Sequence, residues 1–178
     1  MVLVNTLAVE RALGRTREPP RTASEREAAL DPALTDWRTR TVDAGGAGGG
    51  PLDTARLAEA AVALRAVFQD GPDAGVAELN DLLVRHAAVP NLHGEPPVLA
   101  FHPPGADLAG AMTADAGTAL AMVIGVGQGE RLSACEAAGC DLVFFDVTRN
   151  ASRRFCGLPC QNRAKAAAYR ARRTTRTP

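Results

Sequence analysis

The feature that most constrains this chain is the placement of its cysteines, which all lie between residues 135 and 160 of 178. Their spacing is C-x4-C-x15-C-x3-C, and they are Cys135, Cys140, Cys156 and Cys160. Two short cysteine loops joined by a longer connection are a common way to arrange four thiolates in a tetrahedron around zinc. Gly139 and Gly157 supply turn-forming residues in the two loops. We therefore predict that the segment folds around one structural zinc ion.

Other uses of four clustered thiols stay open here: two disulfides, an iron–sulfur cluster, or unligated thiols. The start of the chain lacks the residue order of a signal peptide, and no run approaches the about 20 apolar residues of a membrane span. We expect a soluble cytoplasmic protein without a membrane partner, in a compartment that disfavours disulfides. The spacing matches no ferredoxin pattern, and four thiolates leave no open position for a catalytic water.

Charge is segregated along the chain, although the formal net charge is zero. Residues 147–178 contain eight Arg and one Lys with no acidic residue, and the preceding part is correspondingly acidic. Because such a segment attracts polyanions, we predict that it contacts DNA. The candidate contacts are Arg149, Asn150, Arg153, Arg154, Asn162, Arg163, Lys165, Arg170, Arg172 and Arg173.

A helix over residues 159–173 would place Arg163, Arg170 and Arg173 on one stripe of a slim, alanine-rich rod. Such a rod fits a major groove, and arginine suits both phosphates and guanine edges. Two alternatives stay open. In the first, the basic tail is a solvated face, and some of its arginines pair with the acidic part of the chain. In the second, Arg153 and Arg154 brace the cysteine loops or pair with Asp146 instead of contacting DNA.

For the part of the chain before the cysteine-rich segment, the sequence predicts a mainly α fold with a small β element. Apolar spacing predicts helices from Leu52 to about residue 69, from Asp73 to Ala88 and from Asp107 to Ile124. A shorter helix is expected over residues 31–42 with Pro32 in its first turn, after an exposed loop over residues 14–27. Residues 1–7 form an apolar run of strand or buried-helix type, and Val98–Phe101 a strand or hairpin partner.

Two other features carry no catalytic pattern. The Gly-rich stretch 43–51 lacks a GK[ST] motif and a preceding buried strand, so we interpret it as a loop without a phosphate site. His86, His93 and His102 show neither i, i+4 pairing nor a neighbouring carboxylate in sequence, so we expect surface or partly buried histidines. Without a nucleophile–base pair, nucleotide motif or open metal site, we do not expect an enzyme.

The C-terminal segment resembles the CGNR zinc finger family, whose members combine C-x4-C, a basic core motif and a second cysteine pair followed by G-N-R. This chain has, in that order, Phe144, Asp146, Thr148, Arg149, Asn150, Ser152, Arg153, Arg154, Phe155 and Cys156, then Cys160, Asn162 and Arg163. It departs from the family at Gln161, where members have Gly, and in the shorter spacing of its last two cysteines. Both changes leave the four ligands in place.

The resemblance extends more loosely upstream, at residues 4–7, Trp37, Leu64-Arg65 and Leu79-Asn80, to the helical ABATE domain that accompanies this finger. It implies a stress-responsive transcription regulator of the cytoplasm and nucleoid. We predict an ABATE-like helical domain over 1–128 that senses a small-molecule ligand or mediates homodimerisation. We predict that this domain is followed by a zinc finger with a basic helix over 129–173. A disordered tail is expected over 174–178. The alternatives are a protein or RNA interaction module and a thiol-based redox or metal sensor.

Overall fold

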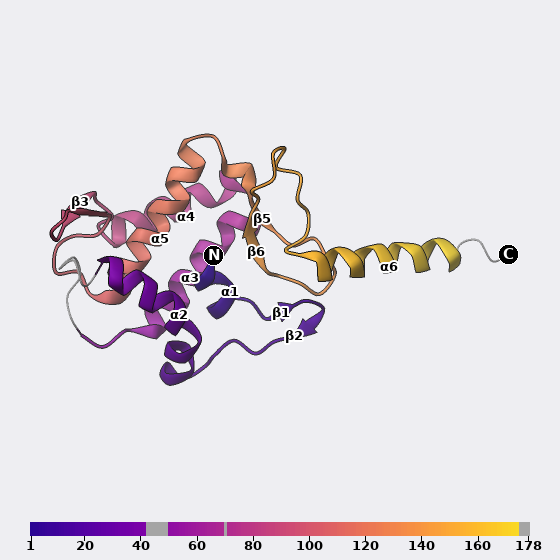
Figure 1. The fold of residues 1–178 in the computed structure, drawn as a ribbon, viewed down its shortest axis with the longest axis horizontal. Coiled ribbons are helices and arrows are strands. Elements are labelled where there is room, and N and C mark those ends of the chain that lie inside the picture. The colour runs from indigo at the N-terminus through magenta and orange to yellow at the C-terminus, as the bar shows by residue number, and fades with distance from the viewer. Residues whose placement is uncertain (42–49, 70, 175–178) are drawn as a thin grey trace.

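The computed structural model of the protein describes residues 1–41, 50–69 and 71–174. In these ranges six α-helices and three small antiparallel hairpins form a rounded body from which the last helix projects (Figure 1). The mainly α fold predicted from the sequence is confirmed. The Gly-rich stretch 43–51 falls largely outside the described residues, as does the predicted tail after Thr174.

The elements follow one another in a simple order along the chain. The helices are α1 (Val2–Leu7), α2 (Ala23–Thr41), α3 (Thr54–Gln69), α4 (Pro72–Arg85), α5 (Leu108–Gly125) and α6 (Leu158–Thr174), with a 3-10 turn, η1 (Gly129–Arg131). The strands are β1 (Arg11–Ala12), β2 (Arg15–Thr16), β3 (Asn91–His93), β4 (Val98–Ala100), β5 (Leu132–Ala134) and β6 (Val143–Phe145). They pair as β1–β2, β3–β4 and β5–β6.

The structure corrects two predictions for the first 41 residues. Residues 14–27 are not a continuous loop, because they include β2 and the start of α2, and Pro32 lies inside that helix instead of its first turn. The helix begins early because Thr22 and Glu25 form a capping box: Glu25 N donates to Thr22 Oγ1 (3.2 Å) and Thr22 N to Glu25 Oε2 (3.0 Å). The apolar run at the start is the short helix α1.

The three longer predicted helices are present with shifted ends. α3 and α5 begin after aspartate caps: Asp53 accepts from the N–H of Ala55 and Arg56, and Asp107 from that of Gly110. Among the described helices, only α5 is long and apolar enough to cross a membrane by length and composition, with a mean hydropathy of 1.4. Half of it is buried inside the protein. It therefore has the character of a core helix.

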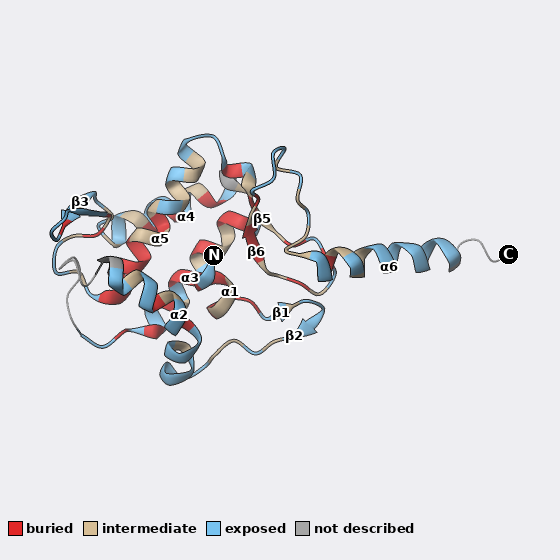
Figure 2. Ribbon diagram, in the orientation of Figure 1, coloured by how far each residue is buried: buried red, intermediate tan, exposed pale blue. Residues whose placement is uncertain are grey.

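Two apolar cores hold the body together, and the second one includes part of the cysteine-rich segment. The first joins α1, α2, α3 and α5 around Leu30 and Leu57. The second joins α3 and α4 to the β5–β6 hairpin, where Leu132 and Val143 are buried against Leu64. α6, in contrast, is mostly exposed (Figure 2). The β5–β6 hairpin is thus anchored in the helical body, while the last helix is not.

The prediction of surface or partly buried histidines is wrong for two of the three. His93 and His102 are buried, with their rings stacked 5.1 Å apart between centroids. His102 Nδ1 lies 3.1 Å from Asp115 Oδ1, a carboxylate that is distant in sequence and supplied by α5. The same carboxylate accepts from Phe101 N (2.8 Å) and Trp37 Nε1 (2.9 Å). Asp115 therefore ties the β3–β4 hairpin to α2 and α5.

We expect Asp115→Ala to destabilise the protein by about 1–3 kcal/mol, because the N–H groups of Phe101 and Trp37 lose their acceptor in a largely buried place. Urea unfolding measured by circular dichroism checks this value. Asp115→Asn keeps one acceptor oxygen and should cost less. Asp81→Ala, at an exposed position of α4, is the control and should change stability by under about 0.5 kcal/mol. Equal stabilities of Asp115→Ala and Asp81→Ala would contradict the role of Asp115 as a buried hydrogen-bond acceptor.

Candidate zinc centre and basic helix

The four cysteines come together because the β5–β6 hairpin and the start of α6 meet. Cys135 directly follows β5, and Cys140 lies in the hairpin loop, where Gly139 adopts a positive φ of 71° that favours glycine. Cys156 lies in the loop before α6, and Cys160 in the first turn of that helix. All four sulfur atoms lie within 4.8 Å of one another. The sequence prediction of a single cluster therefore agrees with the geometry.

The cluster has the size and chemistry of a zinc site. Sulfur–sulfur distances are 3.8 Å for Cys140–Cys156 and 3.5 Å for Cys156–Cys160. Zinc–sulfur bonds of about 2.3 Å in a tetrahedron require about 3.8 Å. Cys135, Cys140 and Cys160 are buried, and burial raises the pKa of the Cys156 and Cys160 thiols. Four crowded thiolates need a cation, and four sulfur ligands leave no place for water, so the site holds one structural zinc ion.

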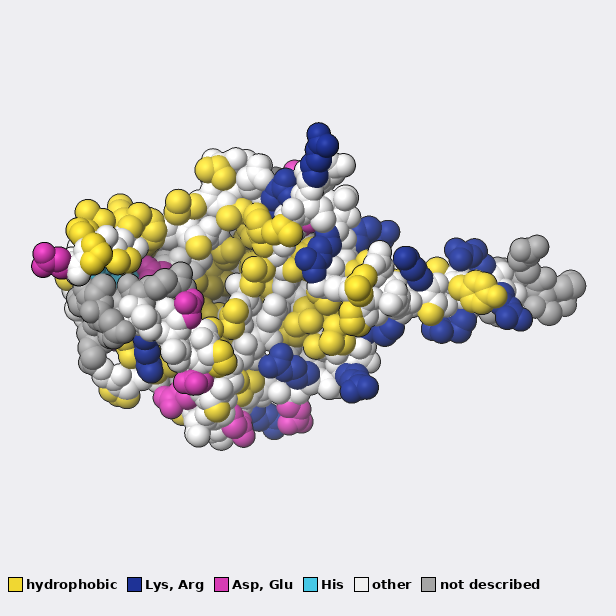
Figure 3. Space-filling model, viewed as in Figure 1, with side chains coloured by type: hydrophobic (Ala, Val, Ile, Leu, Met, Phe, Trp, Pro, Cys, Tyr) yellow, Lys and Arg dark blue, Asp and Glu magenta, His cyan; other side chains and the backbone are white. Residues whose placement is uncertain are grey.

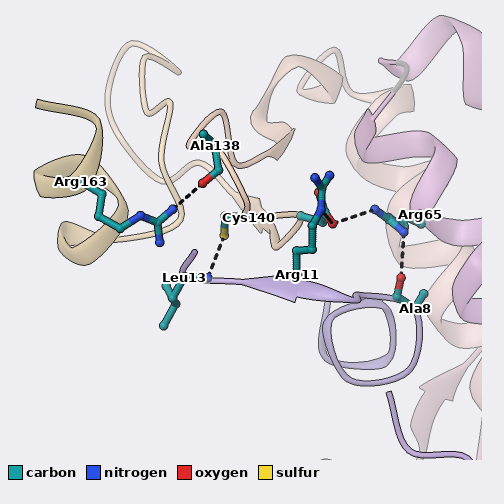
Figure 4. Close-up of polar contacts among 8 residues, drawn as sticks. Ala8, Arg11, Leu13, Arg65, Ala138, Cys140 and Arg163 are labelled. Atoms are coloured by element: carbon teal, nitrogen blue, oxygen red, sulfur yellow. Dashed lines mark hydrogen bonds and ion pairs between the residues drawn. The ribbon is translucent and has the colours of Figure 1, made fainter. Parts of the chain in front are cut away.

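Backbone N–H groups donate to two of these sulfurs. Cys156 N lies 3.4 Å from Cys135 Sγ, within the segment itself. Leu13 N lies 3.5 Å from Cys140 Sγ, across 127 residues of chain (Figure 4). For Cys140, burial opposes ionisation, but hydrogen bonds from the N–H groups of Leu13 and Leu142, together with those from Cys160 and Cys135, lower the pKa of the thiol. A residue near the start of the chain thus stabilises a zinc-bound thiolate.

Leu13 reaches the cysteine because it occupies the turn of the β1–β2 hairpin. Leu13 and Gly14 both have positive φ, 54° and 82°, as in a two-residue type I′ turn. A leucine rarely adopts this conformation, so the turn carries local strain. Gly14 N donates to Gly139 O (3.0 Å), which fixes the turn against the loop of Cys140. Sequence reasoning missed this hairpin because Leu-Gly is not one of the usual turn signals.

Asp141, next to Cys140, joins the same hairpin to the helical body. Arg11 binds its carboxylate in a bidentate pair, with Nε–Oδ2 2.8 Å and Nη2–Oδ1 2.7 Å. Arg65 of α3 lies 3.9 Å from Oδ2 and donates to Ala8 O (2.8 Å) (Figure 4). The Arg11 hydrogen bonds, outweighing burial, lower the pKa of Asp141. Asn5 of α1 adds a further link.

The Asn5 side chain pairs with the backbone of β6 as another strand would. Its Nδ2 donates to Val143 O (2.9 Å), and its Oδ1 accepts from Val143 N (2.8 Å). Asn5 and Arg65 belong to the sequence positions that carry the upstream resemblance, but no role in the metal centre was predicted for them. No pattern in the sequence predicts these contacts, because the partners of Asn5 and Arg65 lie far along the chain.

We expect Asp141→Asn to lower the Tm by about 2 °C, since its ion pairs with two partly exposed arginines are lost. The pKa of Asp141 is lowered in the folded protein, so its stabilising contribution is complete above the ordinary Asp pKa of about 3.9 and is lost only below it. The Tm difference from wild type should therefore be constant between pH 8 and pH 5. Thermal unfolding at several pH values tests this, with Glu10→Gln as control. A difference that shrinks within that range would contradict the pairing.

The predicted motif residue Asp146 supports the loop that carries Cys156. It is buried and accepts from Thr148 N and Arg153 N, both at 2.7 Å. Burial opposes ionisation, yet these donors outweigh it and lower the pKa of the carboxyl. Arg131 Nη1, which sequence reasoning did not select, donates to the carbonyls of Asp146 (2.9 Å) and Thr148 (2.6 Å). Asp146 thus stabilises the turn between β6 and the loop of Cys156.

Three of the predicted nucleic-acid contacts are engaged within the finger. Arg153 donates to Phe155 O (2.8 Å) and Cys156 O, with its guanidinium 4.7 Å from the centroid of the Phe144 ring. Arg154 Nε donates to Glu136 Oε2 (2.7 Å). Arg163 Nη2 donates to Ala138 O (2.7 Å) (Figure 4). Its guanidinium also packs against Gly14. These side chains brace the zinc loops.

The other predicted contacts are exposed and form two groups. Arg149 and Asn150 lie in the turn after β6. Asn162, Lys165, Arg170, Arg172 and Arg173 lie on α6. Every residue from Lys165 to Arg173 is exposed, and dark blue side chains surround this end of the helix (Figure 3). Tyr169, which sequence reasoning did not select, is 56% exposed in the same stretch, with Arg173 5.9 Å from its ring centroid.

A comparison with known protein families finds a similarity for the segment just described. Residues 131–173 match the family model of the CGNR zinc finger. The match begins at Arg131, spans all four cysteines and ends near the tip of α6. Among curated proteins, none matches the chain. The C-terminal part is accordingly similar to a CGNR zinc finger and carries four cysteines placed to bind zinc. The predicted domain boundary at residues 128–129 and the ABATE-like helices stay predictions.

Proposed function

We propose that the protein is a DNA-binding transcription regulator whose zinc centre holds a basic helix against the nucleic acid. The observation that carries the proposal is the exposed segment Lys165–Arg173 of α6, which has four basic and no acidic side chains and projects from the body (Figure 1). Nine helical residues span about 13.5 Å, comparable to the width of a major groove of about 12 Å. Alanines between the charges keep this part of the helix slim.

The energetics of the helix support a polyanionic partner. A short helix without tertiary packing is marginal in water, and like charges within it repel one another. Zinc fixes its first turn through the buried Cys160, which removes the cost of nucleation. Phosphates along the exposed part would relieve the repulsion and release counterions. Arg163 is better assigned to the zinc loop than to DNA, because it donates to Ala138 O.

We propose that the helical part of the chain regulates DNA binding by α6. The contacts of Asn5, Arg11 and Leu13 with the segment 140–143 give it a physical connection to the metal centre. In this proposal it is an ABATE-like unit that senses a ligand or mediates homodimerisation, within a non-enzymatic, cytoplasmic, nucleoid-associated regulator of a stress response. Its action on the finger would pass through the β1–β2 and β5–β6 hairpins.

Fluorescence anisotropy of the zinc-loaded protein with duplex DNA, at 50–200 mM salt, tests the proposal. Four phosphate contacts predict a slope of log K against log salt of about −3.6, so that affinity falls about a hundredfold over this range. Competition with structured RNA separates a DNA regulator from an RNA-binding module. Binding that does not depend on salt, or equal competition by RNA, would contradict the proposal.

A further inference from the structure

A small apolar cavity lies where the helical body meets the β5–β6 hairpin of the finger. Its volume is about 220 Å³, and it is visible as an apolar hollow near the centre of the face in Figure 3. Every side chain that lines it, within the described residues, is apolar. The walls come from Met1 and from α1, α3, α5, β5 and β6, and include Leu64, Phe68, Leu120, Val123, Leu132 and Phe145.

The size and lining of the cavity restrict what it can hold. An apolar cavity of about 150 Å³ accepts benzene, so one of 220 Å³ accepts about nine non-hydrogen atoms. A helix, about 10 Å across with its side chains, is far too large. A charged group would lose its hydration without gaining a side-chain partner. The occupant that fits is therefore a small, uncharged molecule made mainly of hydrocarbon.

We propose that this cavity is a binding site for small uncharged apolar molecules, of the size of a substituted benzene. The inference gives a site to the ligand-sensing part of the proposed function and in that respect rests on it. Binding itself is independent of nucleic acid.

The position of the cavity connects such a ligand to the zinc centre. Leu132 and Phe145 are paired residues of the β5–β6 hairpin and both line the cavity. The same hairpin carries Cys135 and Cys140 between its strands. A molecule in the cavity would contact the helices and the hairpin together, and would stabilise their docked arrangement by binding only to it.

The first test measures thermal unfolding and amide hydrogen exchange of the zinc-loaded full chain without DNA. Ethylbenzene should raise the Tm in a concentration-dependent way and slow exchange in residues 132–145. Benzylammonium, of similar size but positively charged, should do neither. Stabilisation by benzylammonium as well, or stabilisation without protection of the hairpin, would overturn the proposal.

The second test fills or enlarges the cavity. Ala116→Leu places a larger side chain in the lining and should weaken ethylbenzene binding at least about tenfold. Ala77→Leu, at an exposed position of α4, is the matched control and should bind as the wild type does. Leu120→Ala enlarges the cavity and should favour naphthalene over ethylbenzene. Unchanged binding by Ala116→Leu, or an unchanged size preference in Leu120→Ala, would overturn the site, whatever the DNA experiments show.

Discussion

Replacing Cys160 with serine is expected to reduce bound zinc from one ion per chain to a small fraction. The sulfur of Cys160 lies 3.5 Å from that of Cys156, and the residue is fully buried in the first turn of α6. A hydroxyl is a poor zinc ligand, and the three remaining thiolates do not close the tetrahedron. We expect zinc affinity to fall at least about a hundredfold, with loss of ordered structure in the loop of Cys156 and in α6, which the helical body does not anchor.

Metal analysis by mass spectrometry and circular dichroism check this expectation. Asn162→Ala, two residues along α6 and exposed, is the control and should keep one zinc per chain. The helical body should retain most of its helical signal in Cys160→Ser, because its first core does not include the finger. A Cys160→Ser variant that binds zinc as the wild type does would contradict the four-sulfur site.

The second large effect is expected from the exposed part of α6. Replacing Lys165, Arg170, Arg172 and Arg173 together with alanine should weaken duplex DNA binding at least about a hundredfold at 50 mM salt. The slope of log K against log salt should approach zero, since each lost phosphate contact changes it by about one. Alanine favours helices, so the zinc content and the helical signal should be unchanged. Fluorescence anisotropy at several salt concentrations measures both quantities.

A charge-preserving variant separates charge from shape. With Arg170, Arg172 and Arg173 changed to lysine, the salt slope should be kept while any sequence preference weakens, because lysine cannot make the bidentate contacts of arginine. Tight, salt-dependent binding by the alanine variant would place the DNA contacts elsewhere, for example at Arg149 and Asn150. That result would contradict the role assigned to α6.

The features that could be predicted from the sequence are those with a local signal. The spacing of the four cysteines predicted their cluster, and apolar periodicity predicted α3, α4 and α5. The start of α2 also had a local signal, the Thr22–Glu25 capping box, which the low apolar periodicity of that region concealed. These features depend on residues close together in the chain, so a single sequence contains the information.

Contacts between distant segments had no such signal. Leu13 meets Cys140, and Asp115 meets His102 and Trp37, only after the helices have packed. The roles of the arginines were equally ambiguous, because a guanidinium that binds a carbonyl and one that binds a phosphate look the same in sequence. Helical spacing places Arg163 on one stripe with Arg170 and Arg173. In the structure, however, its guanidinium donates to Ala138 O in the loop of Cys140.

The proposed dependence of DNA binding on the zinc centre is tested most directly by removing and restoring the metal in one sample. We predict that a chelator which extracts zinc abolishes salt-dependent binding to duplex DNA, and that one equivalent of zinc, added under reducing conditions, restores it. DNA binding of unchanged affinity in the zinc-free protein would contradict the account, since it would show that the zinc centre is not needed to present the basic helix.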